Sequence, residues 1–508
     1  MSAENNSLPR GWVLPTLGEI VQPTRPRHSP RDFADLPFIG MENIEAHTLK
    51  LLGTVLAGTM RSSAVHFQPS DVLYGRLRPY LNKVFCPDFE GLCSAEFIVF
   101  PQSEHHNSKF IQYLLNSADF VSFASLLNAG DRPRVDFDQI AQYRVPVPPL
   151  PEQRRIVAEI EKQFTRLEAA VAALKRVQAN LKRYRAAVLK AAVEGHLVPT
   201  EASLARAEGR SYEPASELLK RILAERRARW EANQLAKFRA AGKERKAEKW
   251  KSNYEEPYEP KTSSASKLPG GWSWATISQL GFVQSGQTPK GIEQAVQPEG
   301  EIPWFKVGDM NRLGNEKHMI SAAAYISSTD ATQLGLHIHP PGTIIFPKRG
   351  GAISTNKKRL LARLSGYDLN TMGIIPVTRN ISGYLWWWFA GVDLGQLGDG
   401  SNVPQINHGD IEPLCLPIPP LAEQQRIVTE VERRHSFIDE LEMQVEANLK
   451  RAERLRQAIL KRAFEGRLVP QDPDDEPASV LLERIRAERA AKPVNAKPAR
   501  RARKAVAT

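Results

Sequence analysis

Two clusters of basic side chains are the residues of this 508-residue chain that are best suited to bind a ligand. An arginine can donate two hydrogen bonds to one guanine, whereas a lysine can neutralise a phosphate without reading the base sequence. Both clusters are therefore candidates for contact with nucleic acid, and an ordinary solvated turn is the alternative for each. The candidates are Arg76, Arg78, Lys83, Arg132 and Arg134 in the first cluster, and Lys348, Arg349, Lys357, Lys358 and Arg359 in the second.

The net charge of +12 does not by itself argue for a nucleic-acid partner. Residues 211–251 hold 12 basic against 6 acidic side chains, and residues 484–508 hold 9 against 1, so these two stretches carry +14 and the rest carries −2. Any binding must therefore rest on local patches. Another arginine-rich stretch, PTRPRHSPR with Arg25, Arg27 and Arg31, is a weaker candidate for DNA contact and is interpreted as a flexible loop.

The sequence lacks the motifs of an enzyme that acts alone. There is no GxxxxGK[ST] phosphate loop, and the doubled prolines occur as VPPL, IPPL and HPPG, not in the [DNS]PP[YFW] form that amino-methyltransferases use to hold a flipped base. The three cysteines form no CxxC pair, and the histidines lack further ligands at metal-binding spacing. We expect a non-catalytic chain with no metal or cofactor of its own. Three cysteines are too few for a disulfide framework, so a location in the reducing cytoplasm is expected. No stretch approaches the roughly 18 apolar residues of a membrane span, so a soluble protein is expected.

A tandem repeat organises the whole chain. LPRGW recurs as LPGGW at an offset of 260 residues, and EPASELLKRILAER recurs as EPASVLLERIRAER at an offset of 263. Between them, a segment that opens PPLPEQRRIV or PPLAEQQRIV and closes EGHLVP or EGRLVP matches without a gap at an offset of 271. Three ordered matches indicate duplication, in which each copy has a variable globular part followed by a segment of fixed length.

The fixed-length segment is predicted to be a long helix in both copies. Prolines precede Glu152 and Glu423, acidic and polar residues fill the first turn, and a glycine and a proline end the pattern. A helix of about 42 residues would be roughly 63 Å long. Apolar residues seven apart predict a coiled-coil seam, which consists of Ile160, Leu167, Leu174, Leu181 and Val188 in the first copy and Val431, Ile438, Val445, Ala452 and Ile459 in the second.

These elements predict an α+β protein. Two globular domains of similar fold are separated by two long helices that pack as an antiparallel coiled coil, with a pseudo-twofold axis between the halves. The alternative is a pair of surface helices that each pack on their own domain. The predicted division is 1–147 for the first globular domain, 148–199 for the first helix, 200–267 for a short amphipathic helix and basic linker, 268–418 for the second globular domain, 419–470 for the second helix, and 471–508 for a short helix and basic tail.

The two globular domains align as a skeleton and differ elsewhere. DVLYGRLRP from Asp71 resembles TIIFPKRGG from Thr343, where an apolar strand leads into a basic turn. A helix follows in each domain, and its apolar residues are expected in the core: Phe110, Tyr113 and Leu114 match Leu385, Trp388 and Phe389 at an offset of 275. A shared fold with different surfaces is typical of recognition modules that have diverged.

The order of LPxGW, variable domain, PPLxEQ helix and EGxLVP, repeated once, resembles the specificity subunit of type I restriction-modification systems. The resemblance covers nearly the whole chain, and the PPLxEQ to LVP block is its most specific part. It implies that each variable domain is a target-recognition domain for one half of a bipartite DNA site, and that the helices set the gap between the halves. It also implies docking of two modification (methyltransferase) subunits, which bring S-adenosylmethionine for adenine methylation. Restriction and translocase subunits would add ATP and Mg-dependent cleavage.

Because the two domains differ in sequence, the expected target has two dissimilar halves. The rival hypothesis is a coiled-coil protein-interaction scaffold without sequence-specific DNA binding. In that case the basic linker and tail would be solubilising segments.

Overall fold

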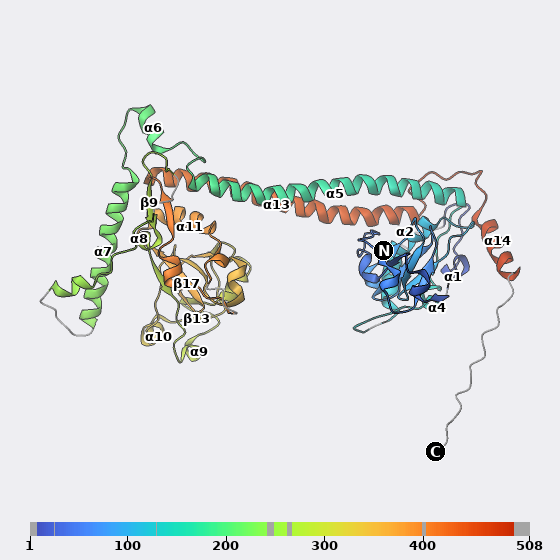
Figure 1. Cartoon of the computed structure of the whole chain (residues 1–508), viewed down its shortest axis with the longest axis horizontal. Coiled ribbons are helices and arrows are strands. Elements are labelled where there is room, and N and C mark those ends of the chain that lie inside the picture. The colour runs from blue at the N-terminus through green and yellow to red at the C-terminus, as the bar shows by residue number, and fades with distance from the viewer. Residues whose placement is uncertain are drawn as a thin grey trace, which may run out of the picture. The chain divides into compact units, whose positions relative to one another are not determined.

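The computed structural model describes residues 8–24, 26–128, 130–240, 248–261, 267–398 and 403–491, so Arg25 and most of the basic C-terminal tail lie outside the described residues (Figure 1). The chain forms two compact units. Unit 1 comprises residues 1–176 and 445–508, and unit 2 comprises residues 177–444. Each unit therefore contains one globular domain together with part of both long helices.

Unit 1 contains two small sheets flanked by helices. Its five-stranded sheet has the order β1-β4-β7-β2-β3, and its three-stranded sheet has the order β6-β5-β8. The strands are β1 (Arg27–His28), β2 (Pro37–Ile39), β3 (Val55–Leu56), β4 (Ala64–Phe67), β5 (Val72–Gly75), β6 (Val84–Phe85), β7 (Gly91–Ser94) and β8 (Phe97–Phe100). The helices of the domain are α1 (Leu17–Ile20), α2 (Ser108–Asn116), α3 (Ala118–Leu126) and α4 (Phe137–Ile140).

Unit 2 contains sheets of five, three and two strands, with the orders β10-β17-β14-β15-β12, β13-β11-β16 and β18-β9. The strands are β9 (Ser273–Thr276), β10 (Gly281–Ser285), β11 (Ile302–Phe305), β12 (His318–Met319), β13 (Tyr325–Ile326), β14 (Ile344–Pro347), β15 (Arg359–Leu361), β16 (Gly366–Tyr367), β17 (Thr371–Pro376) and β18 (Cys415–Ile418). The helices are α8 (Ile277–Leu280), α9 (Ile292–Ala295), α10 (Ser328–Gln333), α11 (Ser382–Ala390) and α12 (His408–Ile411).

The two long helices, α5 (Leu150–Val193) and α13 (Leu421–Phe464), are both 44 residues long and pack together. In unit 1, the Arg456 guanidinium lies 4.0 Å from the centroid of the Phe164 ring. In unit 2, Arg185 Nη2 lies 2.5 Å from Asp439 Oδ1. Each unit thus joins an early part of one helix to a late part of the other, as antiparallel packing requires.

The predicted seam residues are buried to different degrees. All five seam residues of α13 are less than 10% exposed, as are Ile160, Leu181 and Val188 of α5. Leu167 and Leu174 are only partly buried. His435, which lies between the seam residues Val431 and Ile438, is 7% exposed. Packing along the helices therefore includes a polar ring where a regular zipper would have an apolar side chain.

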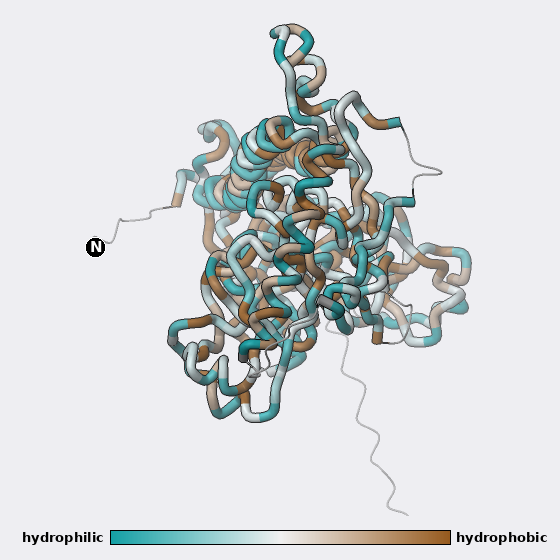
Figure 2. Tube along the Cα trace, turned by 90° about the vertical axis from the view of Figure 1, so that its left-hand side faces the viewer, coloured by the Kyte–Doolittle hydropathy of each residue, from teal (hydrophilic) through white to brown (hydrophobic). Residues whose placement is uncertain are grey.

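The segments that follow each long helix are also helical, in α6 (Glu201–Glu208), α7 (Ala215–Ala240) and α14 (Ala478–Ala491). At 26 residues, α7 is longer than the short helix expected for this linker, because no glycine or proline interrupts residues 215–241. Figure 2 shows hydrophobic residues interspersed with hydrophilic ones along the traced chain. Within the described residues, no helix has the length and apolar character needed to cross a membrane.

Candidate nucleic-acid interface

The repeated LPxGW motif of unit 1 holds its globular domain against both long helices. The indole N–H of Trp12 donates a hydrogen bond to Glu152 Oε2 at 3.1 Å, in the first turn of α5. Gly466, just after α13, has a φ of +69° and packs so closely on Pro9 that a Cβ there would overlap the proline ring. The amide of Ala478, which begins α14, donates to the Gly11 carbonyl at 2.9 Å. The three repeated motifs therefore meet at one junction.

Unit 2 contains the same junction, built from the other copy of each motif. Trp272 Nε1 donates to Glu423 Oε1 at 3.0 Å, and the amide of Ala215 donates to the Gly271 carbonyl at 2.8 Å. Gly195 has a φ of +73°, and a Cβ there would lie 2.6 Å from Pro269 Cγ. In each unit, the LPxGW motif of a domain closes on the EG turn that ends the long helix of the other repeat.

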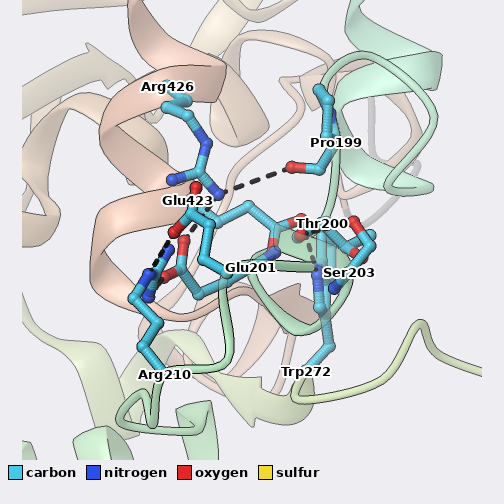
Figure 3. Close-up of polar contacts among 9 residues, drawn as sticks. Pro199, Thr200, Glu201, Ser203, Arg210, Trp272, Glu423 and Arg426 are labelled. Carbon is cyan, nitrogen blue, oxygen red and sulfur yellow. Dashed lines mark hydrogen bonds and ion pairs between the residues drawn. The ribbon is translucent and has the colours of Figure 1, made fainter. Parts of the chain in front are cut away.

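A network of charged groups adds to the junction of unit 2 (Figure 3). The second oxygen of Glu423 accepts a hydrogen bond from the amide of Glu201 at 2.8 Å, and burial raises the pKa of the Glu423 carboxyl. Burial opposes ionisation of Glu201 as well, but hydrogen bonds from Arg210 and Arg426 hold the pKa of that carboxyl below its usual value. The network therefore links the start of α6, the helix that follows α5, to the first turns of α13.

Each globular domain contains a pair of loops with the same backbone pairing. We call residues 76–79 with 132–136 the first tip, and residues 348–350 with 403–408 the second tip. In the first tip, the Val135 amide donates to the Arg76 carbonyl at 3.0 Å, and the Arg78 amide donates to Pro133 at 2.7 Å. In the second tip, the equivalent bonds run from Ile406 to Lys348 at 2.9 Å and from Gly350 to Pro404 at 2.8 Å.

A short helix follows each tip and begins with the same kind of cap. In unit 1, Asp136 and Gln139 form a capping box at the start of α4. In unit 2, Asn407 and Asp410 form one at the start of α12. A capping box satisfies otherwise unpaired amides at a helix start, and it thereby fixes the direction in which the chain leaves the tip. The two tips are therefore the same backbone structure with different side chains.

The first tip is rich in arginine. Arg134 Nη2 lies 2.5 Å from Glu96 Oε1, Arg76 forms an ion pair with Asp136, and Arg132 is exposed. Burial, followed by repulsion from Arg134, lowers the pKa of the Arg76 guanidinium. Arg27, from the stretch expected to be a loop, lies in β1 and lines a cavity of about 340 Å³ with Arg76. The acidic residues orient these guanidinium groups and neutralise part of their charge.

The second tip replaces most of these arginines with neutral or titratable donors and acceptors. Lys348 Nζ donates to Ser285 Oγ at 3.0 Å, and Ser285 Oγ lies 3.1 Å from His408 Nε2. Gln405 Nε2 donates to Asn407 Oδ1 at 2.9 Å. Burial, with a further contribution from Arg349, lowers the pKa of the Lys348 ammonium. This tip offers amide, hydroxyl and imidazole groups beside two cations.

Four of the ten basic residues predicted from the sequence lie outside the tips. Lys83 Nζ donates to the Met41 carbonyl at 2.5 Å, and Lys357 is bonded to the Asn311 side chain. Lys358 is 5% exposed and donates to the Val392 carbonyl at 2.5 Å. The remaining residue, Arg359, donates through Nη2 to the Met310 carbonyl at 3.0 Å. These side chains stabilise turns of their own domains, so we exclude them from the proposed surface.

The pattern of basic residues does not point to four polar residues: Ser285 of β10, which contacts the second tip, and Gln405, Asn407 and His408 within that tip. A signal for the last three exists in the sequence. Pro133 and Pro404 are matched at an offset of 271, the offset of the long helices, so the residues after each proline are equivalent. Within the described part of the chain, no group of three or more His, Cys, Asp or Glu side chains is arranged to hold a metal ion.

Comparisons with known proteins give a family match and several similar relatives. Residues 9–176 match the family model described as the type I restriction modification DNA specificity domain. Among curated relatives, the chain is 24% identical over 426 residues to the type I restriction enzyme EcoKI specificity subunit of Escherichia coli strain K12, covering 79% of this chain and 75% of the relative. It is 27% identical over 235 residues to the EcoDI specificity subunit of Escherichia coli, covering 44% of this chain and 50% of the relative. The match to the EcoAI specificity subunit likewise spans 56% of that relative.

Two solved structures share the fold. The match to a structure from a study of the type I restriction-modification system covers 91% of this chain and 100% of the matched chain, with a TM-score of 0.65 and 20% identity. The HsdS subunit from Thermoanaerobacter tengcongensis covers 92% and 100%, with a TM-score of 0.53 and 20% identity.

Fold and site together define a class of chain with two globular domains and two long helices, in which the two domains share a loop pairing but carry different side chains on it. Residues 9–176 carry the type I restriction modification DNA specificity domain, and the chain is similar over most of its length to specificity subunits of type I restriction-modification systems.

Proposed function

We propose that this chain selects the DNA sequence on which a type I restriction-modification complex acts. Each globular domain reads one half of a bipartite, asymmetric site through its tip. The observation that carries this proposal is the pair of tips, which share four equivalent backbone hydrogen-bonding positions but present different side chains. One backbone frame with two sets of donors is what reading two different half-sites requires.

The long helices are proposed to set the gap between the half-sites. Their equal length of 44 residues supports this role, since each helix is about 66 Å long at 1.5 Å per residue. The junctions support it too, because Trp12 and Trp272 bind each domain to the helix ends of its own unit. Rigid attachment matters because two linked readers need a fixed separation along the DNA.

The proposed partners follow from the same role. Two modification subunits would dock on the helices and bring S-adenosylmethionine for adenine methylation. Restriction and translocase subunits would bring ATP and Mg, so this chain needs no cofactor of its own. A cytoplasmic location suits a protein that acts on DNA in the cell.

A matched shortening of both helices tests the proposal. Removing the equivalent residues 171–177 and 442–448 deletes one heptad from each helix and shortens each by about 10 Å. We expect the gap in the selected site to shrink by about three base pairs, at roughly 3.4 Å per pair, while both half-site sequences are unchanged.

A control deletion makes the result interpretable. Deleting residues 497–503 from the basic tail removes the same number of residues from outside both long helices, and it should leave the gap unchanged. If the helix deletion altered the bases selected in either half-site while the gap stayed the same, the helices would not be the spacer.

A further inference from the structure

One backbone position is shared by the two tips and is occupied by different side chains, each of a type that prefers to contact a particular base. Arg134 forms an isolated antiparallel bridge with Leu77, and Gln405 forms the equivalent bridge with Arg349. The residues on either side of each are fixed by the backbone hydrogen bonds of the tip. The side chains of Arg134 and Gln405 therefore leave their domains from the same place in the same frame.

Both side chains are held by a neighbour before any DNA binds. The Arg134 side chain is 50% exposed, and Glu96 accepts one of its hydrogen bonds at 2.5 Å. A guanidinium has five N–H donors, so one carboxylate partner leaves enough donors for a base edge. Gln405 donates to Asn407 at 2.9 Å and is half-buried. A side chain oriented in advance loses less conformational entropy when it makes a contact.

The chemistry of the two groups differs in a way that maps onto bases. The arginine fork matches the two acceptors that guanine presents in the major groove, and the glutamine amide matches the acceptor and donor of adenine. We propose that Arg134 and Gln405 are equivalent specificity-determining residues, with Arg134 reading a guanine in the first half-site and Gln405 an adenine in the second. This inference rests on the proposed function, because it assumes that the tips face DNA.

Exchanging the two side chains tests the assignment. The full chain, together with its modification subunits, is incubated with a library of randomised double-stranded DNA, and the bound fraction is sequenced. For Arg134→Gln, we expect the preference for guanine over adenine at one position of the first half-site to fall by about 5- to 100-fold, with the second half-site unchanged. For Gln405→Arg, we expect adenine to give way to guanine at one position of the second half-site alone.

Two further variants separate base reading from phosphate binding. Arg134→Lys keeps the charge but loses the fork, so it should lose the guanine preference while total affinity stays within a few-fold. Arg132→Gln removes the exposed neighbour of the same charge and should weaken binding evenly across sequences, with the dependence of log affinity on log salt reduced by about one.

The assignment is overturned if Arg134→Gln and Gln405→Arg leave every base preference unchanged, or if Arg134→Gln behaves as Arg132→Gln is expected to. Thermal unfolding of each variant identifies any that fails to fold, and the other exchange then decides the question. A wild-type chain that selects no two-part motif refutes the proposed function itself, which is a different outcome from a motif whose bases ignore residues 134 and 405.

Discussion

Replacing Gly195 with alanine tests whether the junction of unit 2 is as tight as its geometry indicates. The φ of +73° lies in the left-handed region, where a residue with a Cβ pays about 1 to 2 kcal/mol. The new Cβ would also lie 2.6 Å from Pro269 Cγ and 3.2 Å from Trp272 Cζ2, both parts of rigid rings. Overpacking of this kind costs about 1 to 3 kcal/mol.

Gly209 provides the matched control in the same unit. Its φ of +64° imposes a similar backbone cost, but no atom lies within 4 Å of the position that a Cβ would take there. The difference between Gly195→Ala and Gly209→Ala therefore isolates the contact with the LPxGW motif, at about 1 to 3 kcal/mol. For a unit of this size, each kcal/mol lowers the melting temperature by roughly 2 to 4 °C.

The assay is scanning calorimetry of the full chain and both variants. We expect the melting temperature of Gly195→Ala to lie about 2 to 12 °C below that of Gly209→Ala. Equal melting temperatures would show that the motif yields to the added methyl group, and the view of this junction as a rigid attachment would be wrong.

Three other predictions concern charge and burial. Burial and then Arg185 lower the pKa of His435 to about 4, so the contribution of this neutral side chain to stability is complete above the unfolded pKa near 6.5 and is lost as the pH falls toward 4. His435→Phe should therefore reduce the loss of stability between pH 7 and pH 5 in thermal unfolding by about 1 to 2 kcal/mol, and an unchanged pH profile would contradict this. Both oxygens of Glu423 accept hydrogen bonds, whereas only one oxygen of Glu152 has a partner in the described structure. Glu423→Gln should therefore lower the free energy of denaturant unfolding by about 1 to 3 kcal/mol and Glu152→Gln by less, and the reverse order would refute this ranking of the two carboxylates. Lys358→Met should lower the melting temperature and leave DNA affinity intact, because Lys358 is buried and bonded to a main-chain carbonyl. Arg349→Ala should weaken DNA binding and leave the melting temperature unchanged, because Arg349 is exposed, and the opposite pattern would exclude Arg349 from the interface.

The sequence predicted those features that depend on periodicity and repetition. Proline and glycine signals placed the long helices within a few residues of their bounds, because helix ends are set by local chemistry. The matched apolar residues of the two domains, such as Phe110 and Leu385, lie in the core as expected. Trp388 is only partly buried. The division of the chain into six segments and the pseudo-twofold relation remain predictions.

The composition of the tips depended on long-range pairing that no local pattern encodes. Arg76 and Val135 are bonded across 59 residues, and Lys348 and Ile406 across 58, so stretches that are far apart in the sequence form one pair of loops. Charge alone does not separate exposed cations from buried ones: Lys358 is charged, but its ammonium group binds a main-chain carbonyl inside the domain. The uncharged Gln405 gave no signal until its matched proline was recognised.

Sequencing of adenine methylation in cells that carry the modification subunits, with and without this chain, tests the central claim most directly. We predict N6-methyladenine at a single bipartite site whose two halves differ in sequence and are separated by a constant gap, and we predict its loss when the chain is absent. Methylation that persists without the chain, or that marks one uninterrupted or palindromic motif, would contradict the account.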